Sequence, residues 1–347
     1  MRIETGPTQR RKDSEKVSAR IAQHSVLCLV SILLFALCSL AEAQPVKKIP
    51  RIGFLAALSP SAISARVEAF HQGLAELGYV DGKTIAIEYR WANGKFEQVP
   101  ALAAEMVNSK VELIVTAGPT DTRAAKQATS TIPIVMAFDN DPVGSGFVAT
   151  LARPGGNITG LSTFTPETTG KRLELLKEIV PKLGRAAVFG TSTEPGKEQS
   201  LKETQSVAAV LGIHLHYIEI GSPKDIEPAF RETVRERANA VLVLNSPVLN
   251  SRRGELAELA TKSKLPTAYG QGEYVQAGGL MSYGPNIVEL FRRTATYVDK
   301  IFKGVKPSEL PVQQPKTFEF IINLKTAKQI GLAIPPNVLT RADRVIR

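Results

Sequence analysis

Cysteine is almost absent from this sequence of 347 residues, which contains only Cys28 and Cys38. Both lie in one apolar segment near the N-terminus, so the chain without that segment has no thiol. This excludes a disulfide framework, a cysteine-ligated zinc site and a cysteine nucleophile. A large chain without cysteine suits an oxidising compartment, because no thiols can pair wrongly there.

Long apolar runs are also scarce, and the only one is the 16-residue segment 25–40 (SVLCLVSILLFALCSL). Basic residues precede it, and Ala41-Glu42-Ala43 follows it. A basic leader, a short apolar run and a small-residue site predict a signal peptide, 1–43, that is cleaved after Ala43. Since a stable membrane span usually needs about 20 apolar residues, an uncleaved anchor is the weaker alternative. We therefore expect export to the periplasm.

Motifs for catalysis and for metal binding are missing. His24 lies in the leader, His71 lies within a predicted helix, and His214 and His216 alternate along a predicted strand, so no pair has helical metal-ligand spacing. The sequence has no GxSxG elbow and no phosphate-binding GxxxxGK[ST] loop. We predict no enzymatic activity, no metal and no cofactor, with an exported hydrolase as the minor alternative.

Positive charge is in excess but is dispersed. The leader holds six Lys/Arg and four Asp/Glu, so the rest of the chain has 37 basic and 29 acidic residues, a net charge of +8. After Lys47 the basic residues are interspersed with acidic ones, and no nucleic-acid-binding motif is recognisable. We expect a solvated basic surface rather than a nucleic-acid interface.

From Arg51 onward, short apolar runs rich in β-formers alternate with stretches of helical periodicity, which is typical of βαβ units with a parallel sheet. The length suits two such α/β domains. The first set predicts strands at 51–58, 84–91, 111–117, 132–138 and 157–164, and helices at 61–77, 96–109, 120–128 and 146–152. The second predicts strands at 185–190, 214–220, 240–244, 266–270, 280–283 and 318–322, and helices at 166–180, 197–211, 224–237, 251–263 and 287–302.

Small hydroxyl and amide residues dominate the loops that follow the predicted strands. In parallel sheets, ligands bind beyond the carboxyl ends of the strands, so these loops are where a site is expected. Such side chains direct neutral hydrogen bonds, and the helix N-termini behind them can hold a carboxylate. The loops are 57–61, 116–122, 138–142, 189–194, 244–247 and 269–271.

Two motifs resemble a known family. DPVG at 141–144 and RPGGN-x-TG at 153–160 are similar to those of ABC-transporter substrate-binding proteins of the tryptophan/aromatic amino acid type. The resemblance extends from Arg51 to Gly331. It implies a type I periplasmic binding protein fold, in which two Rossmann-like lobes with parallel sheets are joined by a three-crossover hinge. The expected lobes are 48–160 plus 284–312, and 161–283 plus 313–341.

The same resemblance implies a ligand site between the lobes of a periplasmic importer component. We expect the two lobes to close on a small ligand and the closed form to be recognised by the permease and ATPase subunits. The position in the loops alone adds Ser59 and Gln271 to the candidates. Those carried over by position are Gly118, Pro119, Thr120, Asn140 and Asp141 in the first lobe, and Thr163, Phe164, Thr191, Ser192, Glu194, Asn245 and Ser246 in the second.

The pair Asn245-Ser246 departs from the family pattern, because relatives that bind amino acids look like Asp-Asn there. A carboxylate at this position is a natural partner for an α-ammonium group, since charge-assisted hydrogen bonds are roughly twice as strong as neutral ones. The departure leaves two alternatives. Either Glu194 or Asp141 takes over that role, or the ligand is an aromatic or aliphatic carboxylate without an amine. Asp141, before Pro142, is equally well explained as a helix cap.

A ligand-sensing receptor or regulator of the same fold is the alternative function. It would carry a further domain, and we find no helix-turn-helix before Arg51 and no second membrane segment. We therefore expect a monomeric carrier of a small molecule that reaches the membrane only through its transporter.

Overall fold

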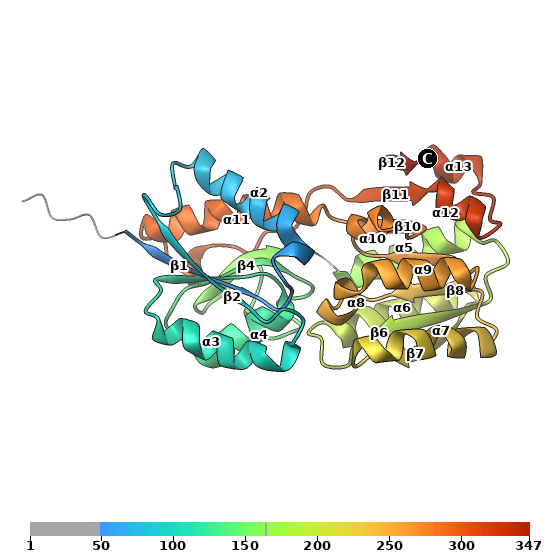
Figure 1. The fold of residues 1–347 in the computed structure, drawn as a ribbon, viewed down its shortest axis with the longest axis horizontal. Coiled ribbons are helices and arrows are strands. Elements are labelled where there is room, and N and C mark those ends of the chain that lie inside the picture. The colour runs from blue at the N-terminus through green and yellow to red at the C-terminus, as the bar shows by residue number, and fades with distance from the viewer. Residues whose placement is uncertain (1–48, 164) are drawn as a thin grey trace, which may run out of the picture. The chain divides into compact units, whose positions relative to one another are not determined.

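The computed structural model describes residues 49–163 and 165–347. The predicted signal peptide, 1–43, lies outside the described residues, and so does Phe164. Among the described residues, no helix is both long and apolar enough to span a bilayer. These residues form two β-sheets, each covered by helices (Figure 1).

The first sheet has five strands, all parallel, in the order β2-β1-β3-β4-β5. The strands are β1 (Arg51–Ala56), β2 (Ala86–Trp91), β3 (Leu113–Thr116), β4 (Ile134–Asp139) and β5 (Ile158–Ser162). Its helices are α2 (Ser64–Glu76), α3 (Val99–Asn108), α4 (Pro119–Ala128) and α11 (Ile287–Phe302), with short 3-10 turns η1 (Ser61–Ile63) and η2 (Phe96–Gln98).

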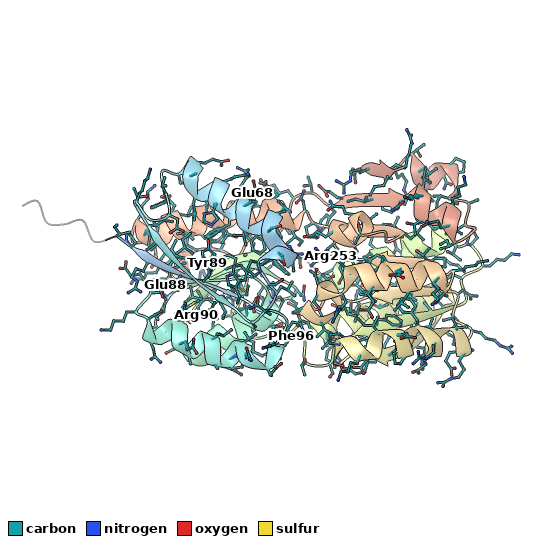
Figure 2. The ribbon with its side chains drawn as sticks, viewed as in Figure 1. Glu68, Glu88, Tyr89, Arg90, Phe96 and Arg253 are labelled. Atoms are coloured by element: carbon teal, nitrogen blue, oxygen red, sulfur yellow. The ribbon has the colours of Figure 1, made fainter. Side chains whose placement is uncertain are left out.

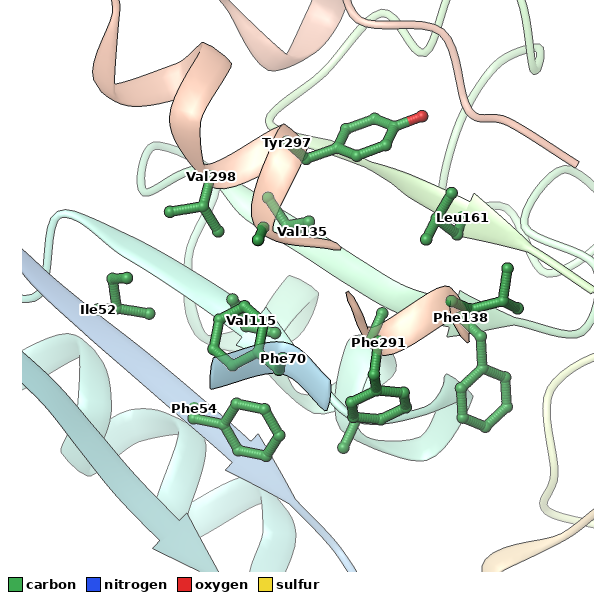
Figure 3. Close-up of a cluster of buried hydrophobic side chains, with 14 of the residues drawn as sticks. Ile52, Phe54, Phe70, Val115, Val135, Phe138, Leu161, Phe291, Tyr297 and Val298 are labelled. Carbon is green, nitrogen blue, oxygen red and sulfur yellow. The ribbon is translucent and has the colours of Figure 1, made fainter. Parts of the chain in front are cut away.

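Helices cover both faces of this sheet (Figure 1). Successive side chains of a strand point to opposite faces, so β1 contributes to two separate clusters of apolar side chains. Phe54 packs against Phe70 of α2 and Phe291 of α11 (Figure 3). On the opposite face, Gly53 must lack a side chain, because a Cβ there would lie 2.3 Å from Sδ of Met106 on α3.

The second sheet has seven strands in the order β12-β11-β10-β9-β8-β6-β7, and β10 and β11 are its antiparallel pair. Its strands are β6 (Arg185–Gly190), β7 (His214–Glu219), β8 (Ala240–Val243), β9 (Thr267–Tyr269), β10 (Met281–Gly284), β11 (Glu319–Asn323) and β12 (Arg344–Ile346). Its helices are α5 (Thr165–Ile179), α6 (Lys197–Leu211), α7 (Ile226–Arg235), α8 (Pro247–Ser251), α9 (Arg253–Lys262), α10 (Gly272–Gln276), α12 (Leu324–Gln329) and α13 (Pro336–Leu339), with η3 (Pro223–Asp225).

The core of the second lobe also lies on both faces of its sheet. Leu173 and Leu176 of α5 pack on one face, and Phe230 of α7 and Leu256 of α9 pack on the other. The rings of Phe189 on β6 and Phe230 pack edge to face, with their centroids 5.1 Å apart. Full burial of these large apolar side chains supplies the main driving force for folding each lobe.

The predicted α/β fold with two parallel-sheet lobes is confirmed. The chain passes between the sheets after β5, after β10 and before β11, where the short turn η4 (Pro307–Glu309) precedes the third passage. Two of these passages lie side by side, since Ser162 N donates to Gln313 O and Gln313 N donates to Gly160 O. The residue limits expected for the lobes stay a prediction.

The helix predicted at 146–152 is wrong, because this segment consists of turns and bends. Gly146 adopts φ +71°, and the N–H groups of Phe147 and Val148 both donate to the carbonyl of Pro142. These bonds close a compact loop and leave no run of helical hydrogen bonds.

Candidate functional site

A cavity lies where loops of the two lobes meet. Its lining comes from the segments after β1, β3 and β4 of the first sheet and after β6, β8 and β9 of the second. The empty space is about 420 Å³, including space open to solvent. The lining residues are Ala57, Leu58, Ile63, Arg66, Ala117, Gly118, Pro119, Asp121, Phe138, Asn140, Glu194, Asn245, Ser246, Pro247, Asn250 and Gln271.

Asp121 places a carboxylate on this cavity. It lies in the first turn of α4, which begins at Pro119, and an acidic side chain there is favoured by the helix dipole. The side chain is 3% exposed, and its Oδ1 has no hydrogen-bond partner among the described residues. Burial raises the pKa of Asp121 well above its ordinary value. The charge of Glu194 raises it further, and a backbone hydrogen bond from Ala57 opposes both.

Glu194 brings a second buried carboxylate to the cavity, from the loop after β6. Thr120 Oγ1, on α4 of the first lobe, donates to its Oε2 at 2.7 Å, and Asn140 Nδ2 lies 3.5 Å from its Oε1. Burial raises the pKa of Glu194 to about 8, although the Thr120 bond and the charge of Arg123 oppose the rise. One lobe therefore supplies Asp121 and the other Glu194, and both lack a full counter-charge.

Arg66 of α2 is the cation that lines the cavity, and its charge is already paired. Its Nε donates to Glu273 Oε1 at 2.8 Å and its Nη2 to Gln271 Oε1 at 2.9 Å, both in the second lobe. Its guanidinium carbon lies 5.8 Å from the Phe138 ring centroid and 5.9 Å from that of Phe291. Burial raises the pKa of Glu273, but the charge and hydrogen bond of Arg66, a backbone hydrogen bond and the charge of Arg253 together leave that pKa below its ordinary value.

Amide and hydroxyl groups form the second-lobe wall. Ser246 caps α8, because its Oγ accepts from Leu249 N at 3.2 Å, and it also accepts from Thr191 Oγ1 at 3.0 Å. Asn250 Nδ2 donates to Gln271 Oε1 at 2.7 Å. The Thr191 bond joins the segments after β6 and β8, and the Asn250 bond joins the segments after β8 and β9.

Further contacts between the lobes surround the cavity. Arg253 Nη2 of α9 donates to the carbonyl of Ala62 in η1 at 3.3 Å (Figure 2). Arg123 Nη1 of α4 donates to the carbonyl of Thr193 at 2.6 Å. Phe96 of η2 packs against apolar clusters of both lobes (Figure 2).

The structure brings half of the predicted site residues to the cavity wall. Those that line it are Gly118, Pro119, Asn140, Glu194, Asn245, Ser246 and Gln271. Thr120 and Thr191 do not line it, but they bond to Glu194 and Ser246, which do. Ligand contact by any of these residues stays a prediction.

The other predicted residues lie elsewhere. Ser59 Oγ accepts from Ala62 N, and Thr163 is buried with its Oγ1 donating to Asp139 O. Ser192 is exposed. Asp141 Oδ1 accepts from Gly144 N at 2.9 Å, which closes a local turn, and it caps no helix because residues 142–152 form turns and bends. Phe164 lies outside the described residues.

The sequence prediction omitted Arg66, Asp121 and Asn250, which line the cavity. Asp121 lay in the expected loop 116–122, so it could have been predicted from its position. Arg66 and Asn250 could not, because a polar residue inside a helix is usually exposed to solvent.

Comparison with known proteins gives consistent matches. The model of the family described as ABC transporter substrate binding protein matches residues 51–346. The tyrosine-binding protein of Clostridioides difficile (strain R20291) is 24% identical over 286 residues, which is 82% of each chain.

Two solved structures are also similar. The ABC domain in complex with L-Trp from Streptococcus pneumonia is 26% identical, with a TM-score of 0.80 over 86% of this chain and 99% of that one. The ligand-free, open structure of a substrate binding protein with adhesive properties from Clostridium difficile is 25% identical, with a TM-score of 0.63 over the same shares.

Proposed function

Because this chain belongs to the family of ABC transporter substrate-binding proteins, which bind ligands rather than catalyse reactions, we propose that it captures an amino acid through its α-ammonium group. The ammonium binds between Asp121 and Glu194, and closure of the lobes presents the loaded protein to a membrane transporter. The observation that carries this proposal is the pair of buried carboxylates on one cavity.

A buried carboxylate without a counter-charge is unfavourable, and the effective penalty is several kcal/mol per ion. Asp121 and Glu194 share this penalty, and the negative charge of Glu194 disfavours ionisation of Asp121. An ammonium group placed between them supplies the missing charge and up to three N–H donors, one of which suits the unpartnered Oδ1 of Asp121. The pair of carboxylates supports an amine-bearing ligand, and we propose that Glu194 takes the role that a carboxylate at position 245 would otherwise have.

The rest of the ligand is expected to be apolar. Leu58, Ile63 and Phe138 line the cavity together with Pro119, and they offer contact surface but no further hydrogen bonds. The names of the similar proteins, with L-Trp and tyrosine as ligands, favour an aromatic side chain.

Hinge closure is the expected mechanism, because the two carboxylates come from different lobes. A ligand that needs both binds the closed form better and shifts the population towards it. The TM-score is higher with the L-Trp complex (0.80) than with the open, ligand-free structure (0.63). This difference supports the interpretation that the cavity is in a closed form.

The cellular context completes the proposal. The leader 1–43 directs export, and the mature protein works as a monomer in the periplasm with a permease and an ATPase. The basic leader and the Ala41-Glu42-Ala43 site support export.

The test is calorimetry and thermal shift on the secreted, purified protein with the 20 amino acids and their deaminated analogues. A ligand at 100 times its Kd should stabilise the fold by about 2.7 kcal/mol. Asp121→Asn should weaken binding of an amino acid about tenfold or more, since a hydrogen bond to a charged group contributes about 1.5–3 kcal/mol. Glu198→Gln is the control, because Glu198, four residues after Glu194 in the first turn of α6, is 78% exposed. Equal affinity for an amino acid and its deaminated analogue would contradict the proposal.

A further inference from the structure

Arg172 of α5 is a buried cation without an acidic partner. Its side chain is fully buried, and the groups to which it donates hydrogen bonds are neutral. Its Nε donates to Thr168 O at 3.3 Å, its Nη1 donates to Val243 O at 3.2 Å, and its Nη2 donates to Thr169 Oγ1. Among the described residues, no carboxylate forms an ion pair with it. Burial lowers the pKa of Arg172 to about 10, so the guanidinium still carries its charge near neutral pH.

An isolated charge of this kind is expensive to bury, and three neutral acceptors offset only part of its lost hydration. The contacts tie α5 to the end of β8, but a neutral side chain could do the same. A buried charge beside a binding cavity is therefore a candidate for a functional role.

The geometry around Gly270 connects Arg172 to the cavity. A Cβ on Gly270 would lie 2.4 Å from Asn245 Oδ1 and 2.8 Å from Arg172 Nη1. The amide oxygen and the guanidinium nitrogen are therefore at most 5.2 Å apart (2.4 plus 2.8 Å), beside the end of β9. Asn245 itself lines the cavity, so Arg172 lies directly behind a residue of the wall.

We propose that Arg172 is a positioning residue that selects for a carboxylate on the ligand. Its guanidinium attracts the Oδ1 of Asn245, which leaves the amide N–H groups of Asn245 to donate to that carboxylate, and its charge favours an anion at this end. The inference rests on the proposed function and adds the orientation of the bound ligand to it. The ammonium binds at Asp121 and Glu194, and the carboxylate binds at Asn245.

Arg66 is less suited to this role, because its charge is neutralised by Glu273 and one of its donors is used by Gln271. The proposal also explains why the side chain at position 245 is neutral. An aspartate there would pair with Arg172 and cancel the charge that attracts the ligand.

The experiment compares L-tryptophan with tryptamine, which keeps the amine and the ring but lacks the carboxylate, by calorimetry on the full mature protein. Arg172→Gln should weaken L-tryptophan binding about tenfold or more, because Asn245 is no longer oriented to donate to the carboxylate and the positive charge behind it is lost. It should change tryptamine binding less than about threefold. Asn245→Asp should shift selectivity in the same direction while leaving Arg172 in place, and Arg172→Lys should keep part of the preference for L-tryptophan.

Phe230→Leu is the control for loss of stability alone, since Phe230 is buried in the second-lobe core, on α7. It should leave the ratio of the two affinities unchanged. If Arg172→Gln does not fold, as judged by circular dichroism, the ratio of the two affinities in Asn245→Asp tests the inference. An unchanged ratio would overturn it. If Arg172→Gln loses affinity equally for L-tryptophan and tryptamine, the inference about Arg172 is overturned but the proposed function is not. A wild-type protein that binds neither probe nor any other of the 20 amino acids would overturn the proposed function and the inference with it.

Discussion

Replacing Glu194 by glutamine keeps the size of the side chain and removes its ability to ionise. Burial raises the pKa of Glu194 from 4.5 to about 8, and each unit of pKa corresponds to about 1.4 kcal/mol, so ionising it in the folded protein costs up to roughly 5 kcal/mol. The wild-type protein bears this penalty only at a pH where Glu194 is ionised. The variant never bears it.

The sign of the pH dependence of stability follows from the number of protons bound in the folded and unfolded states. Between pH 4.5 and about 8, Glu194 is protonated when folded and ionised when unfolded, so the unfolded state binds fewer protons. The free energy of unfolding then falls as pH rises, by about 1.4 kcal/mol per pH unit for one such group. Its stabilising contribution is complete below pH 4.5 and is lost as pH rises through about 8. The raised pKa values of Asp121 and Asp139 act in the same direction, and because the charge of Glu194 contributes to both rises, Glu194→Gln reduces these contributions as well.

Urea denaturation at pH 5, 7 and 9 measures the effect. Glu194→Gln should match the wild type at pH 5 and exceed its stability at pH 9 by several kcal/mol, up to about 5. Glu198→Gln should follow the wild type at every pH, because its side chain is 78% exposed. Parallel pH profiles for Glu194→Gln and the wild type would refute the assignment of Glu194 as a buried, uncompensated carboxylate.

Two further changes test the site by stability. Gly270→Ala should lower the free energy of unfolding by about 1–3 kcal/mol and weaken ligand binding, because its Cβ would collide with Asn245 and Arg172. Gly254→Ala, where nothing lies within 4 Å of the added Cβ, should be neutral or slightly stabilising in urea denaturation. Arg66→Met should cost about 3–5 kcal/mol by leaving Glu273 unpaired, and adding Glu273→Met should recover most of the loss. The exposed pair Arg231–Glu227, with side chains 66% and 64% exposed, should contribute less than about 1 kcal/mol in the same assay.

The regular elements could be predicted from the sequence because their signals are local. The helix expected at 287–302 has the observed limits of α11, and Asn286 caps it by accepting from Glu289 N at 3.0 Å. The short helices α8 and α10 were not predicted, since five residues are too few to show helical periodicity. The strand β12 has only three residues and forms by pairing with β11.

The site could be predicted only in part, for a related reason. Parallel strands end at one edge of their sheet, so the loops that carry Glu194 and Asn245 could be identified from strand order alone. Arg66 and Arg172 lie inside helices, where periodicity does not separate a buried arginine from a solvated one. Arg66 is buried by a partner 207 positions away, and no local pattern contains that information.

On the proposed function, the same charges control both selectivity and closure. Closing the lobes removes water from Asp121 and Glu194, which opposes closure unless the ligand brings a cation. The bonds of Arg66 to Glu273 and of Thr120 to Glu194 form across the lobes and offset part of that penalty. An apolar molecule without an amine leaves the penalty in place, however well it fills the cavity. Closure therefore depends on the ligand's charge, because only a ligand with differential affinity for the closed form can shift the population.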